Sequence, residues 1–187
     1  MSTTARDRLR EAQDFLSPKV VRERAVAEID ELFRSGSAPE PAPEGFLRGR
    51  LITSTTWDGF DLVGRRLAEL YMPWLGKSFD PGAGEGVNVL KRSAVGPMRA
   101  LWPSYKVLRE HEDRVEAFRF RTRVDPGAVD PSINVLKIDY DFEANPDFII
   151  RRILDELVQL DDGLYLGKVL YRQKGRYRTI GFFSLEP

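Results

Sequence analysis

Large aromatic side chains and two lysines are the residues whose types and placement could form a binding site. Aromatic rings can line a cavity while an indole N–H or a phenol hydroxyl orients a ligand, and a lysine inside an apolar strand can meet a carboxylate. The candidate ligand-binding residues are Trp74, Lys77, Trp102, Tyr140, Tyr165 and Lys168. For each residue taken singly, ordinary core packing with snorkelled lysines is the alternative interpretation.

Carboxylates for acid–base chemistry are less clearly marked. Asp139 and Asp141 share one face of a predicted strand beside Tyr140, and a solvent-facing sheet is the alternative interpretation. No catalytic residue is therefore assigned. The lone histidine, His111, lies among charged residues and cannot build the usual two- or three-histidine metal site. The chain has no cysteine, which excludes disulfides, zinc ribbons and iron–sulfur ligation. Because no other metal motif stands out, we expect neither a metal site nor a cofactor.

Composition narrows the class of protein. The chain has 187 residues, of which 42% are hydrophobic and 31% charged, as in a globular protein. Its 29 basic and 29 acidic residues cancel, which argues against nucleic-acid binding, since that needs a basic field. Neither an apolar signal-peptide core nor a run long enough to span a membrane is present in the sequence, so a soluble cytoplasmic protein is expected.

The N-terminal part is helical in pattern and is followed by a proline-rich linker. Apolar residues recur at helical spacing through 4–34, and Ser17-Pro18 is typical of the start of a second helix. The stretch 37–44 carries alternating prolines, which favour a stiff extended chain. The expected organisation is a helical segment at 1–36, a linker at 37–44 and a β-barrel domain at 45–187.

The rest of the chain is rich in short strands. Alternating or β-rich runs occupy 46–55, 74–80, 87–92, 105–110, 116–124, 134–142 and the two arms of 164–185. Helical patterns occur at 58–72 and after Asn145-Pro146-Asp147. Lys174-Gly175 predicts the turn of the last hairpin, whose arms each contain an interior glycine, Gly167 and Gly181, typical of a bend, bulge or close approach. The fold class predicted is mainly β (α+β), an antiparallel barrel of about eight strands with N-terminal helices.

Two short segments resemble a known family. Gly45-Phe-Leu-Arg-Gly49, then Asp58-Gly59, and then Trp74-Leu-Gly-Lys-Ser-Phe-Asp80 are similar to the N-terminal module of the bacterial Gly-x-Trp-x-Gly proteins. Leu47 stands at the position of the signature tryptophan, and the match covers about a fifth of the chain. The closing hairpin is similar to that of calycin-like (lipocalin-like) barrels. Much of the family has no assigned activity, so the resemblance implies a calycin-like fold more than a function.

Three functions are compatible with these features. The favoured hypothesis is binding of a small, largely apolar ligand, such as a fatty acid or other apolar acid, inside a barrel just wide enough for one molecule. The second is a cofactor-independent isomerase or lyase acting on an apolar carbonyl compound. The third is an interaction module in which the helices at 4–34 bury their apolar stripes on the barrel, on a second copy in a homodimer, or on another partner.

Overall fold

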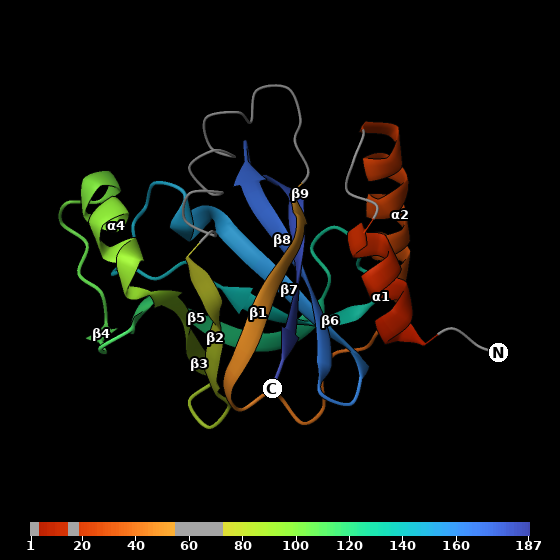
Figure 1. Ribbon diagram of the computed structural model, residues 1–187, viewed down its shortest axis with the longest axis horizontal. Coiled ribbons are helices and arrows are strands. Elements are labelled where there is room, and N and C mark those ends of the chain that lie inside the picture. The colour runs from red at the N-terminus through yellow and green to blue at the C-terminus, as the bar shows by residue number, and fades with distance from the viewer. Residues whose placement is uncertain (1–3, 15–18, 55–72) are drawn as a thin grey trace.

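A closed antiparallel β-barrel forms the centre of the protein (Figure 1). This computed structural model describes residues 4–14, 19–54 and 73–187. Within them the strands pair in the order β3-β2-β1-β9-β8-β7-β6-β5, and pairing of β3 with β5 closes the ring. The ring strands are β1 (Gly45–Ser54), β2 (Trp74–Asp80), β3 (Glu85–Lys91), β5 (Arg114–Pro126), β6 (Asn134–Asp139), β7 (Ile153–Asp161), β8 (Leu164–Gln173) and β9 (Arg176–Glu186). The predicted antiparallel barrel of about eight strands is confirmed.

The strand pattern of the sequence decides which side chains enter the barrel. On β5, Phe118 and Phe120 are buried while the arginines that alternate with them face outward. The alternation breaks at Ala117, which is also buried, because the register with β3 shifts between Val87 and Asn88. Phe118 takes up this irregularity with a φ of 54°.

The predicted closing hairpin is also confirmed. β8 and β9 pair from Tyr165–Leu185 down to Gln173–Arg176, and the turn residues Lys174 and Gly175 both have positive φ. Two positive φ values in a two-residue loop match the right-handed twist of the strands. The register of this pair shifts beside Gly181, so that glycine lies at an irregularity of the kind expected.

Two helices cover one outer wall of the barrel. α1 (Ala5–Asp14) and α2 (Lys19–Ser35) lie side by side against β7 and β8 (Figure 1). A second hydrophobic core joins them to the outward side chains of the barrel, and its buried members include Leu9, Ile29, Leu32, Phe33, Val158, Leu164, Leu166 and Phe182. The apolar side chains of Leu9, Ile29, Leu32 and Phe33 are therefore buried on the protein's own barrel. The division into a helical segment, a linker and a barrel domain stays a prediction.

The helix predicted after Asn145-Pro146-Asp147 is wrong. This segment makes one 3-10 turn, η2 (Ile150–Arg152), and then enters strand β7. On β7 the inward residues Ile153 and Leu157 belong to the barrel core, while Val158 packs under the helices. Because both faces of the strand are buried, its apolar residues do not alternate with polar ones and mimic a helical spacing.

Connections at one end of the barrel also differ from expectation. Of the predicted strand at 105–110 only β4 (Arg109–Glu110) forms, beside the start of β5. An unpredicted helix, α4 (Val95–Leu101), follows the 3-10 turn η1 (Arg92–Ala94). The helix predicted at 58–72 lies outside the described residues.

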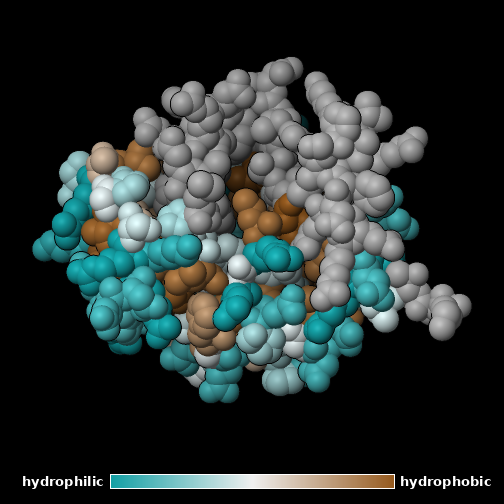
Figure 2. Space-filling view, in the orientation of Figure 1, coloured by the Kyte–Doolittle hydropathy of each residue, from teal (hydrophilic) through white to brown (hydrophobic). Residues whose placement is uncertain are grey.

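The lower part of the face in Figure 2 is mostly hydrophilic, with hydrophobic side chains visible in small groups between the polar ones.

Candidate functional site

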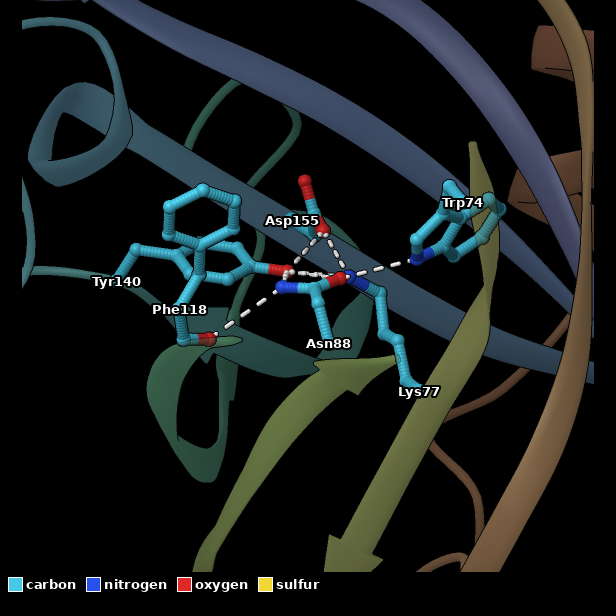
Figure 3. A network of polar contacts seen from close by, with 6 residues as sticks. All are labelled: Trp74, Lys77, Asn88, Phe118, Tyr140 and Asp155. Carbon is cyan, nitrogen blue, oxygen red and sulfur yellow. Dashed lines mark hydrogen bonds and ion pairs between the residues drawn. The ribbon is translucent and has the colours of Figure 1, made fainter. Parts of the chain in front are cut away.

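Two paired strands, a third strand from the opposite wall and the residue after a fourth bring five polar side chains together inside the barrel (Figure 3). Lys77 lies on β2 directly opposite Asn88 of β3, so both side chains enter from the same wall. Asp155 enters from β7, whose inward neighbours are Ile153 and Leu157, and Tyr140 follows the end of β6. Trp74 at the start of β2 completes the set, and none of the five is more than 8% exposed.

Hydrogen bonds link these five side chains into one network. Lys77 Nζ lies 2.9 Å from Asp155 Oδ2 and 3.1 Å from Asn88 Oδ1, and it also donates to the hydroxyl of Tyr140. The Tyr140 hydroxyl donates to Asp155 Oδ2 over 3.1 Å and accepts from Asn88 Nδ2 over 3.0 Å. Trp74 Nε1 donates to Asn88 Oδ1 over 3.1 Å. All three N–H groups of the Lys77 ammonium therefore have acceptors.

Aromatic rings surround the ammonium group of Lys77. Its Nζ lies 5.0–5.5 Å from the ring centroids of Trp74, Phe120, Tyr140 and Phe183. The faces of such rings are electronegative and attract a cation, most strongly when water is excluded. The surroundings therefore favour a charged lysine despite its complete burial.

Glycines make room for three of these rings. A Cβ atom added at Gly49, Gly86 or Gly167 would lie 2.3, 2.4 or 2.1 Å from the ring of Trp74, Phe120 or Phe183 respectively. Each ring therefore lies directly over a strand that has no side chain there. The close approach anticipated for Gly167 is confirmed, and the sequence positions of these glycines set where the rings around Lys77 can lie.

Burial and pairing act in opposite directions on the two charged groups. Burial lowers the pKa of Lys77, and the adjacent Asp155 carboxylate opposes that shift. Burial raises the pKa of Asp155, and Lys77 and the Tyr140 hydroxyl oppose it. Each group therefore depends on the other to remain ionised in this apolar interior.

One oxygen of Asp155 has no hydrogen-bond donor among the described residues. Oδ1 is buried and accepts no hydrogen bond from the part of the chain that the structure describes. In Figure 3 it points away from the other labelled residues, whereas Oδ2 takes both Lys77 and Tyr140. A buried carboxylate oxygen without a donor is costly, because it has lost water and gained nothing in return. This oxygen is where the network can accept a further group.

The other predicted site residues lie elsewhere. Trp102 is buried at the end of α4, packs edge-on against Phe118 and donates its Nε1 to the carbonyl of Phe148 over 3.2 Å. Tyr165 is half-buried and lies four residues along β8 from Val169, the strand partner of Asp155, or about 13 Å away. The structure thus brings Trp74, Lys77 and Tyr140 together and leaves Trp102 and Tyr165 apart from them.

Lys168 does not enter the barrel, so its predicted role as an interior anchor is wrong. Its neighbour Gly167 faces inward, and the next residue of a strand must face the other way. The Lys168 Nζ lies 2.7 Å from Asp30 of α2 and 4.2 Å from the ring centroid of Phe33. It belongs to the wall between the barrel and the helices.

The carboxylates first considered for acid–base chemistry are also outside. Asp139 Oδ2 is 3.0 Å from Arg123, and Asp141 Oδ1 is 2.8 Å from Arg151, both on the outer surface. The interior acid is Asp155, which sequence reasoning missed because β7 was interpreted as a helix. A strand would have placed Asp155 on the face of Ile153 and Leu157, and an asparagine between two valines at 87–89 was the matching signal for Asn88.

Tyr105 is hydrogen-bonded to the backbone of Phe118. Its loss should change how the free energy of unfolding depends on pH. Its hydroxyl accepts the backbone N–H of Phe118 over 2.7 Å, and burial raises the pKa of Tyr105 to about 12. A raised pKa means that the phenol contributes stability below its ordinary pKa of 10.0, which is lost as the pH rises through about 12. Tyr105→Phe should cost about 1–3 kcal/mol at neutral pH, because the Phe118 N–H is left unpaired.

Urea denaturation of wild type and Tyr105→Phe, repeated as the pH approaches 12, checks this expectation. The difference in free energy of unfolding should shrink with rising pH, since only the wild type has this phenol to ionise. A difference that stays constant or grows would contradict the raised pKa of Tyr105.

Comparisons with known proteins add little to this geometry. No protein-family model and no curated protein matches the chain. Among solved structures, a crystal structure of a protein from Thermomonospora curvata is similar over 94% of this chain and 97% of that chain, with 17% identity and a TM-score of 0.47. Similarity at this level carries no argument about function.

The fold and the site define the class of protein on their own. The chain forms a closed antiparallel β-barrel of eight strands, a fold compatible with ligand binding. In the described part of the chain no helix is long and apolar enough to cross a membrane. The two segments that resemble the Gly-x-Trp-x-Gly proteins, 45–49 and 74–80, are paired strands here, with Leu47 opposite Lys77.

Proposed function

We propose that the barrel interior binds a small, largely apolar molecule that carries one neutral hydrogen-bond donor. The observation that carries this proposal is the buried Oδ1 of Asp155, which has no donor among the described residues. A hydroxyl or N–H of a ligand placed against this oxygen would satisfy it. The rings of Trp74, Phe120 and Phe183 supply the apolar surroundings for the rest of such a molecule.

The charge balance of the network favours a neutral ligand over an ionised acid. Lys77 already gives its N–H groups to Asp155, Asn88 and Tyr140, so a ligand carboxylate would have to displace one of them. An ionised carboxylate beside Oδ1 would also be repelled by Asp155. A fatty acid or other apolar acid fits this site in its protonated form, because the acid is then itself a donor.

The test uses three probes with one skeleton: benzyl alcohol, benzoate and toluene. Calorimetric titration at neutral pH should give tighter binding of the alcohol than of either other probe by about tenfold or more, the worth of a hydrogen bond to a buried charge. The double variant Lys77→Met/Asp155→Leu should bind alcohol and toluene alike. Asp139→Asn, which changes a carboxylate on the outer wall, is the matched control and should keep the preference for the alcohol.

Two results would overturn this assignment. One is that no probe binds the wild type and native mass spectrometry of the purified protein finds no adduct. The other is that the preference for the alcohol survives in the double variant, since Asp155 could not then be the acceptor.

Proton transfer on an apolar carbonyl compound is the second candidate, favoured by one specific observation. A carboxylate whose pKa burial raises, with a tyrosine hydroxyl 3.1 Å away, is suited to act as a base. Asp155 would take a proton from the carbon next to the carbonyl and return it. Incubating acetophenone in D₂O with the protein tests this, since catalysed deuterium uptake that Asp155→Asn abolishes would indicate an enzyme, whereas no uptake leaves binding alone.

A further inference from the structure

A cavity lies on the outside of the barrel, between α1 and the ends of β1, β8 and β9. It has a volume of about 360 Å³ and is lined by Arg6, Leu9, Arg48, Gly49, Arg50, Leu164, Ser184 and Glu186. The register of β1 and β9 builds it, because Arg48 is opposite Glu186 and Arg50 is opposite Ser184. Gly49, between the two arginines, faces Trp74 in the interior, so strand β1 separates this cavity from the interior site.

The charges around this cavity favour an anion. Three arginines, Arg6, Arg48 and Arg50, and one acidic residue, Glu186, line it, and Arg50 already makes another interaction. The nearest approach of Arg6 to that carboxylate is 4.0 Å, and Arg48 forms no ion pair with the described residues. Positive charge therefore exceeds negative charge in the lining. Guanidinium groups present paired N–H donors that match the oxygens of a phosphate.

The hydroxyl of Ser184 adds a polar group to the lining of this cavity. Ser184 is 3% exposed and lines the cavity, yet its hydroxyl has no hydrogen-bond partner in the described part of the chain. Asp155 Oδ1 is the only fully buried unpaired side-chain atom of the described residues, so the Ser184 hydroxyl is open to the cavity and can donate to a group inside it. The apolar side chains of Leu9 and Leu164 form the wall beside it.

We propose that this cavity binds the phosphate group of a small phosphate monoester with an apolar substituent. A phosphate monoester offers three terminal oxygens and nearly two negative charges at neutral pH, enough acceptors for the guanidinium groups of Arg6 and Arg48 and the hydroxyl of Ser184, whereas a carboxylate offers two oxygens. The substituent lies against Leu9 and Leu164. The site is independent of the interior site and of whatever that site binds.

The test is calorimetric titration of the full chain at low ionic strength with phenyl phosphate and with inorganic phosphate. Phenyl phosphate should bind more tightly than inorganic phosphate because of the apolar wall. Arg48→Gln should weaken its binding about tenfold, the worth of a charge-assisted hydrogen bond, and Ser184→Ala about threefold. Arg176→Gln, an exposed arginine at the opposite end of β9, makes the same change in net charge and should leave binding unchanged.

Three other outcomes would contradict the proposed phosphate site. Equal weakening by Arg48→Gln and Arg176→Gln would mean that net charge alone attracts the anion. Inorganic phosphate binding as tightly as phenyl phosphate would remove the monoester from the proposal, and no binding of either probe to wild type would overturn the site. Circular dichroism of each variant shows that the fold is retained, so that loss of binding can be attributed to the side chain.

Discussion

Asp155→Leu alone is expected to lower the free energy of unfolding by about 3–5 kcal/mol, because it leaves the buried ammonium of Lys77 without its counter-charge. Lys77→Met alone should cost a similar amount for the converse reason. Both side chains are 0% exposed, so water cannot replace the missing partner in either variant. Urea denaturation, followed by tryptophan fluorescence, measures these differences.

The double variant Lys77→Met/Asp155→Leu should be close to wild type in stability, or more stable by about 1–4 kcal/mol, since replacing a whole buried ion pair by apolar residues removes both desolvation penalties. Asn88 and Tyr140 can still bond to each other in that variant, and Trp74 can still donate to Asn88. A double variant as unstable as the sum of the two singles would show that the ion pair is not a coupled unit.

The free energy of unfolding of the single variant Asp155→Leu should also have a distinctive pH dependence. Burial lowers the pKa of Lys77 below 10.5, and Asp155 is the group that opposes this shift, so Asp155→Leu lowers the pKa of Lys77 further. A lysine with a lowered pKa binds its proton more weakly in the folded state than in the unfolded state. The single variant should therefore regain stability as the pH rises towards 10.5, whereas the double variant should show no such gain.

Much of the barrel could be predicted because its strands carry local signals. The Lys174-Gly175 turn and the alternation at Phe118 and Phe120 depend on neighbouring residues only, and both are confirmed. β7 could not be recognised locally, since its outer face is buried by α2, which lies more than a hundred residues earlier in the chain. Tertiary packing thus removed the alternation by which a strand is recognised.

Only part of the site could be predicted from the sequence, again because local signals are incomplete. Trp74, Lys77 and Tyr140 were found from their residue types, but the direction in which a strand residue points depends on register. Lys168 was placed on the wrong face because nothing local distinguishes it from Lys77, and only the glycine before it marks the inward position. Asp155, which carries the proposed function, could not be found because the sequence pattern of its strand, β7, predicts a helix.

Gly167→Ala should strongly destabilise the barrel wall. The added Cβ would lie 2.1 Å from Phe183, whose ring is fully buried, packs edge-on against Trp74 at 5.4 Å and lies over Lys77. The ring therefore has little room to move, and the overpacking should cost about 3 kcal/mol or more. The free energy of unfolding in urea measures it.

Two companion variants make this expectation decisive. Gly96→Ala in α4 adds the same methyl group where no atom lies within 4 Å, and it should be neutral or stabilise the protein by up to about 1 kcal/mol, as alanine does in a helix. Adding Phe183→Leu to Gly167→Ala should restore part of the lost stability, because the smaller side chain leaves space for the methyl group. If Gly167→Ala proved as harmless as Gly96→Ala, the glycines could not be what positions the rings around Lys77.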